Sequence, residues 1–79
     1  MSPPLTLYYR QDCHLCEQML AELHAIYGDG LQLSLVDVDS DAALKQRYGL
    51  QVPVLMGGAT LLGLGRLDRS SLEDYLETR

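Results

Sequence analysis

The chain has no tryptophan, no phenylalanine and only two cysteines among its 79 residues. Its core must therefore be built from aliphatic side chains and from some of its five tyrosines. Basic residues are also scarce, since six Lys and Arg stand against eleven Asp and Glu, for a formal charge of −5. A protein that holds a nucleic-acid backbone needs a basic face, so we expect no nucleic-acid partner.

Long apolar runs are absent as well, because no stretch approaches the roughly eighteen residues of a membrane span. The N-terminus leads into a short apolar stretch that ends at Arg10, without the charged region and apolar core of a secretory signal. We therefore expect a cytoplasmic protein without membrane contact. So short a chain supports one hydrophobic core, so residues 1–79 are expected to form a single, monomeric domain.

The hydrophobic pattern predicts the element order β-α-β-α-β-β-α, without repeats or linkers. Strands are expected over residues 5–9, 31–38, 54–56 and 59–64, and helices over 16–27, 41–48 and 68–78. Gly57-Gly58 predicts the turn between the last two strands, and Ser70 with Glu73 has the spacing of a helix capping box. We expect Asp37 and Asp39 to cap the helix that follows the second strand.

This order predicts an α/β fold with a four-stranded mixed sheet and helices on both of its faces. The first two strands should be parallel, since a helix separates them, and the crossover should be right-handed.

The two cysteines form the motif Cys13-His14-Leu15-Cys16, directly after the first strand and at the start of a helix. Unpaired N–H groups and the helix dipole favour an anion at this position, and the thiolate is the nucleophile of disulfide exchange. Cys16 lies one turn further on, on the apolar face of the helix. The motif predicts thiol–disulfide exchange by a dithiol mechanism, with Cys13 as nucleophile and Cys16 as resolving thiol.

Other interpretations of the pair are weaker. A disulfide between Cys13 and Cys16 closes too short a loop to stabilise the fold by much. A zinc site needs about four ligands, and the two histidines, His14 and His24, share the helix with the cysteines, so no metal is expected within one chain. A cluster bridging two chains through Cys13, and two buried inert cysteines, both stay open.

The residues inside the motif also have two interpretations each. His14, when protonated, would stabilise the Cys13 thiolate, or it is simply exposed in the first turn of the helix. Leu15 is either an apolar contact for a partner or an ordinary surface leucine.

The segments 8–16 and Gln51-Val52-Pro53-Val54 resemble glutaredoxins, in particular the short bacterial glutaredoxin-like proteins, and the resemblance extends over nearly the whole chain. It implies a thioredoxin-like fold with a redox-active centre. Arg10 stands where the family has a lysine, three residues before the nucleophile. Gln51-Val52-Pro53 resembles the family's Thr-Val-Pro, which implies a cis Val52–Pro53 bond that faces the cysteines and presents the Val52 backbone to an extended substrate.

The chain also departs from the family pattern. Cys-Pro-Tyr-Cys is replaced by the Cys-His-Leu-Cys motif, and the family's Gly-Gly-x-Asp is only loosely matched by residues 63–68, which include Arg66. The resemblance implies glutathione or a protein disulfide as partner, and no cofactor apart from glutathione as a candidate co-substrate. A binding or redox-sensing module with little turnover is the alternative. The expected substrate-binding residues are Arg10, His14, Leu15, Gln51, Val52 and Pro53.

Overall fold

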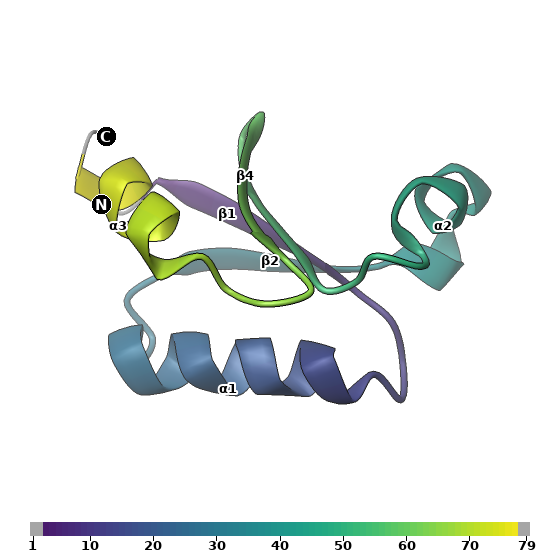
Figure 1. The fold of residues 1–79 in the computed structure, drawn as a ribbon, viewed down its shortest axis with the longest axis horizontal. Helices are drawn as coiled ribbons and strands as arrows, with labels where there is room; N and C mark the ends of the chain where they lie inside the picture. The colour runs from purple at the N-terminus through teal and green to yellow at the C-terminus, as the bar shows by residue number, and fades with distance from the viewer. Residues whose placement is uncertain (1–2, 78–79) are drawn as a thin grey trace.

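The fold is seen in a computed structural model, which describes residues 3–77. The elements are β1 (Pro4–Tyr9), α1 (His14–Tyr27), β2 (Gln32–Asp37), the 3₁₀ turn η1 (Val38–Ser40), α2 (Ala42–Tyr48), β3 (Val54–Gly57), β4 (Thr60–Leu64) and α3 (Arg69–Glu77). The strands form one sheet in the order β2-β1-β3-β4 (Figure 1). β1 and β2 are parallel and the other pairs are antiparallel, so the predicted mixed sheet is confirmed.

One face of the sheet carries the hydrophobic core. Leucines at alternate positions of β1 point to this face, and Leu55 pairs directly opposite Leu7 across the β1–β3 ladder. Side chains from α1 and α3 cover them, so both helices lie on the same face of the sheet. The core residues are Leu5, Leu7, Met19, Leu23, Leu55, Leu62, Leu72 and Tyr75.

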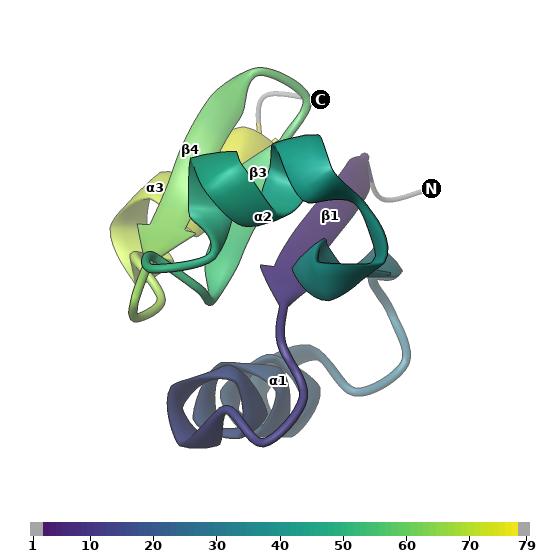
Figure 2. The ribbon, with the colours of Figure 1, turned by 90° about the vertical axis from the view of Figure 1, so that its right-hand side faces the viewer.

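The other face of the sheet is covered by α2. Tyr8 points to this face, and its ring stacks on Tyr48 of α2 with 4.6 Å between the ring centroids. No residue of α2 is buried, which makes it the most exposed of the three α-helices. Figure 2 shows α1 and α2 on opposite sides of β1, so the prediction of helices on both faces is confirmed. Within residues 3–77, no helix is long and apolar enough to span a membrane.

The hairpin turn lies one residue later than predicted. Gly57 belongs to β3 and pairs with Thr60, so the two turn residues are Gly58 and Ala59. Gly58 has a φ of 60°, which glycine adopts without strain. Gly57 has a different role, because a Cβ there would lie 2.6 Å from the ring of Tyr75. Its missing side chain lets α3 pack closely on the sheet.

The chain after β2 also differs from the prediction. Val38 was expected in the strand, but β2 ends at Asp37, whose carboxylate accepts a hydrogen bond from the Asp39 N–H at 2.9 Å and so bends the backbone into η1. The cap of α2 is Asp41, whose carboxylate accepts from the N–H groups of Ala43 and Leu44. The prediction that Asp37 and Asp39 cap α2 is therefore wrong, although Asp37 does cap η1, the short helix directly after β2.

The cap of α3 is Asp68 and not the predicted Ser70. The Asp68 carboxylate accepts hydrogen bonds from the Ser71 hydroxyl at 2.7 Å and from the Ser71 N–H at 3.1 Å. Aspartate carries two acceptor oxygens, so it can accept both bonds, which explains why it starts the helix two residues before the serine. The predicted end of this helix, at Thr78, lies outside the described residues.

This cap makes α3 sensitive to acid. The hydrogen bonds from Ser71 hold the pKa of the Asp68 carboxyl below its ordinary value of 3.8. A lowered carboxyl pKa stabilises the fold above the unfolded-state pKa, and this stabilisation is lost as the pH falls through the folded-state value. We predict that Asp68→Ala lowers the Tm at pH 7 and that the difference from the native protein shrinks as the pH falls below about 4.

Thermal unfolding followed by circular dichroism between pH 7 and pH 3 measures this dependence. Ser70→Ala is the matched control in the same turn, and it should leave the Tm nearly unchanged because alanine is a good helix former. A larger loss of Tm for Ser70→Ala than for Asp68→Ala would show that the capping box is correct after all.

Candidate active site

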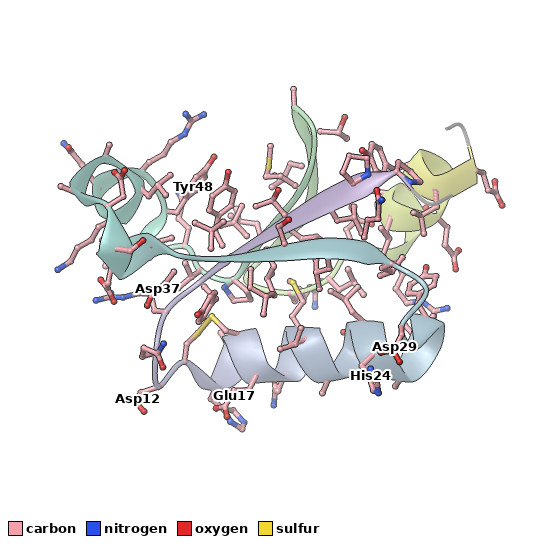
Figure 3. All side chains as sticks on the ribbon, turned by 180° about the vertical axis from the view of Figure 1, so that it is seen from behind. Asp12, Glu17, His24, Asp29, Asp37 and Tyr48 are labelled. Carbon is pink, nitrogen blue, oxygen red and sulfur yellow. A yellow bond between two sulfur atoms is a disulfide. The ribbon has the colours of Figure 1, made fainter. Side chains whose placement is uncertain are left out.

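The cysteine pair lies where β1 ends and α1 begins. Cys13 is the N-cap residue of α1, in an extended conformation, and its carbonyl accepts the first helical hydrogen bond from the Glu17 N–H at 3.1 Å. Cys13 and Cys16 are joined by a disulfide, with 5.2 Å between their Cα atoms. Figure 3 shows this bond in yellow at the first turn of the helix.

The helix N-terminus points a hydrogen bond at Cys13. The Cys16 N–H is one of the N–H groups that a helix leaves without a partner, and it donates to the Cys13 sulfur at 3.2 Å. The same N–H, together with the helix dipole, would stabilise a negative charge on this sulfur after reduction. The arrangement gives the pair the electrostatics that disulfide exchange requires.

The two sulfurs differ in their access to solvent. Cys16 lies on the buried face of α1 with Met19 and Leu23, and only 4% of its surface is exposed. Cys13 is half-buried. This low exposure confirms the prediction that Cys16 is the buried member of the pair. Cys16 is buried because the 3.6-residue period of the helix places it on the apolar face.

Asp12 immediately precedes the pair and has a left-handed backbone, with a φ of 57°. It is the only residue other than glycine among residues 3–77 with a positive φ. Aspartate tolerates this conformation better than most residues because of its short polar side chain. Asp12 is not among the site residues predicted from the sequence, although aspartate just before a helix cap is a recognisable signal for such a turn.

Arg10 connects the end of β1 to the segments that follow β2. Its Nε donates to the Asp39 carboxylate at 3.1 Å, and its Nη1 donates to the Gly49 carbonyl at 3.3 Å. Lys45 lies 3.8 Å from the other oxygen of Asp39. The side chains of Arg10 and Asp39 are both 35% exposed, so the pair contributes little to stability by itself, about 0–1 kcal/mol.

The two residues between the cysteines both face solvent. The ring Nε2 of His14 lies 3.0 Å from the side-chain amide of Gln18, one turn further along the helix. Leu15 is half exposed. The contact between His14 and Gln18 does not involve a cysteine sulfur.

Residues 51–53 lie at the same end of the sheet as the cysteines. Val54 pairs with Tyr8 in the antiparallel β1–β3 ladder, so the residues just before Val54 lie beside the residues just after Tyr8. The Val52–Pro53 peptide bond is cis. Pro53 is buried and its carbonyl accepts from the Gly65 N–H at 2.8 Å, whereas Gln51 is exposed. Arg66 follows Gly65 in the exposed loop before α3.

Acidic side chains predominate around the disulfide. Figure 3 labels Asp12, Glu17 and Asp37 at this end of α1. In the described part of the chain, no group of three or more His, Cys, Asp or Glu side chains is arranged to hold a metal ion.

A Cys-x-x-Cys disulfide at the first turn of the helix that follows the first strand, on a four-stranded mixed sheet, defines a thioredoxin-like protein with a redox motif. Residues 4–77 match the family profile described as Glutaredoxin-like domain (DUF836), and the chain belongs to this family. The resemblance to glutaredoxins is thereby confirmed.

Solved structures agree with this assignment. The chain is 39% identical to a structural-genomics target protein from X. campestris, covering 95% of this chain and 97% of that one, with a TM-score of 0.70. It is 30% identical to a protein from Nitrosomonas europaea, covering 96% and 93%, with a TM-score of 0.81. Oxidized glutaredoxin 2 from Chlamydomonas reinhardtii is 19% identical, covers 94% and 76%, and has a TM-score of 0.58, which shows the shared fold. No curated protein matches the chain in sequence.

The unequal exposure of the two sulfurs predicts unequal alkylation. After reduction, iodoacetamide should modify Cys13 first and Cys16 at least about tenfold more slowly, because the buried thiol must wait for the first turn of α1 to open. Mass spectrometry of peptides from a timed series measures both rates. Cys13→Ser and Cys16→Ser report each thiol alone, and equal rates in the two variants would contradict the assignment.

Proposed function

We propose that the chain is a thiol–disulfide oxidoreductase of the glutaredoxin type that works by a dithiol mechanism. The hydrogen bond from the Cys16 N–H to the Cys13 sulfur is the observation that carries this proposal. This hydrogen bond supports Cys13, the more exposed cysteine, as the thiolate, and the disulfide bond supports the buried Cys16 as the thiol that attacks in the second step.

The reaction proceeds in two exchanges. The Cys13 thiolate attacks one sulfur of a substrate disulfide R–S–S–R′, forms the mixed disulfide Cys13–S–S–R, and releases R′–S⁻, which takes up a proton. Cys16 then loses its proton and attacks the Cys13 sulfur, which forms the Cys13–Cys16 bond and releases R–S⁻. The substrate gains two electrons. Two external thiols, or one dithiol, then reduce the Cys13–Cys16 bond and are themselves oxidised to a disulfide.

The substrate-binding residues are proposed on two sides of Cys13. Leu15 offers an exposed apolar contact beside the pair. The ring nitrogen of His14, which now contacts the Gln18 amide, would form a hydrogen bond with a substrate group instead. Arg10 would pair with a carboxylate of a glutathionyl group, since guanidinium and carboxylate pair in a bidentate manner.

On the β3 side, Val52 offers its backbone to an extended substrate, next to the buried Pro53 and the exposed amide of Gln51. Glutathione or a protein disulfide is the proposed partner. We further propose that the protein acts as a monomer in the cytoplasm, with no resident cofactor and no metal.

The two cysteine variants test the mechanism directly. Cys16→Ser should accumulate a stable mixed disulfide on Cys13 when mixed with a glutathionylated peptide, because the second exchange is blocked. Cys13→Ser should form no adduct and should lower turnover to the uncatalysed rate. Intact-mass measurement detects the adduct, and a coupled glutathione reductase assay measures turnover.

An adduct on Cys16 in the Cys13→Ser variant with retained turnover would show that the nucleophile is wrongly assigned. If neither variant differs from the native protein and turnover is absent throughout, the chain is a binding or sensing module instead.

A further inference from the structure

A pocket of about 310 Å³ opens beside the disulfide. It lies between the β1–α1 loop, the first turns of α1, and the edge strand β2. Both cysteines line it, but no residue of the segment 51–53 does. Because β2 and β3 flank β1 on opposite sides, the pocket lies on the flank of the disulfide that faces away from the proposed Val52–Pro53 contact.

The inner surface of the pocket is aliphatic. Leu7 lies at its base in the core, and Leu20 and Leu35 line its sides while remaining 38% and 50% exposed. Leu20 belongs to the apolar pattern of α1, yet no neighbouring side chain covers it fully. An aliphatic chain seated here would remove both leucines from water, which favours binding by about 25 cal/mol for each Å² covered.

The rim of the pocket is charged. Asp12 and Glu17 contribute two carboxylates and Arg10 contributes one guanidinium, which already contacts Asp39. Tyr9 and the two cysteines are the other titratable residues that line it. The rim therefore has a formal charge of −1. While Arg10 is paired with Asp39, a ligand carboxylate in the pocket would meet net repulsion, and the glutathionyl contact proposed above requires Arg10 to leave Asp39. An uncharged chain meets none.

We propose that this pocket binds the reductant of the protein, and that the reductant is a small aliphatic dithiol without a carboxylate. The proposal rests on the function proposed above. A volume near 300 Å³ is at the lower end of small-molecule sites, which suits a short chain better than a folded partner. Since both cysteines line the pocket, a dithiol seated there has its sulfurs next to the bond it must reduce.

The chemistry balances without a further reagent. One thiolate of the dithiol attacks the Cys13 sulfur, and Cys16 leaves and takes up a proton. The second thiolate of the dithiol attacks the sulfur now joined to Cys13, closes a ring disulfide in the reductant, and releases Cys13 as a thiol after protonation. Two electrons pass from the dithiol to the protein disulfide.

Dihydrolipoamide is the probe, because it joins a dithiol to an uncharged aliphatic chain, and dithiothreitol is the comparison without that chain. Stopped-flow reduction of the oxidised protein should saturate with dihydrolipoamide and remain linear with dithiothreitol. Leu35→Ser should lower the rate with dihydrolipoamide roughly three- to fivefold and leave the rate with dithiothreitol unchanged. Leu61→Ser is the matched control, since Leu61 is 49% exposed on the other edge strand, outside this pocket.

The charge of the rim is tested separately with dihydrolipoate, which carries a carboxylate where dihydrolipoamide carries an uncharged amide. At low ionic strength, Glu17→Gln should raise the rate with dihydrolipoate about twofold, and Glu22→Gln, on the same helix but outside the pocket, should not.

The pocket proposal would be overturned if Leu35→Ser and Leu61→Ser changed the rate with dihydrolipoamide equally. It would also be overturned if Glu17→Gln and Glu22→Gln changed the rate with dihydrolipoate equally. Neither result would contradict the proposed oxidoreductase activity. If no dithiol reduces the bond in any variant, the proposed function itself fails. Unfolding midpoints within about 1 °C of the native protein are required for every variant compared.

Discussion

The parallel pairing of β1 with β2 is the constraint on which the site depends. Two neighbouring parallel strands cannot be joined by a hairpin, so the chain between them must cross one face of the sheet, and here it crosses as α1. The N-terminus of α1 therefore lies at the carboxyl end of β1. A cysteine placed at this junction receives the unpaired N–H groups of the helix, and a second cysteine three residues later is turned into the core. The difference between the two sulfurs is thus a result of topology.

The opposite flank of the site depends on weaker contacts. The segment 51–53 follows α2, and α2 has no buried residue to fix it to the sheet. The helix α2 is held instead by the stacking of Tyr48 on Tyr8 and by the bonds of Arg10 to Asp39 and to the Gly49 carbonyl. These contacts are partly exposed and each is weak in water. Arg10 therefore both occupies the position expected for a substrate contact and helps to hold the segment that lies beside it.

The sequence predicts the elements that depend on local periodicity. The face of α1 that buries Cys16 follows from the helical spacing of apolar residues, and the order of strands and helices follows from the same pattern. The fine positions of turns and caps were less predictable, because neighbouring residues with similar propensities compete. Gly57 and Gly58 both suit a turn, and only the approach of Tyr75 decides which one must lie in the strand. Contacts between distant segments, such as Arg10 with Asp39, leave no local signal in one sequence.

The reduction potential of the Cys13–Cys16 pair tests the central claim most directly. Equilibration in glutathione redox buffers, followed by counting free thiols by mass, measures it without a choice of substrate. A working dithiol oxidoreductase should have a value between about −180 and −270 mV. A value below about −300 mV would describe a bond that the glutathione pool does not readily reduce, and it would contradict the account.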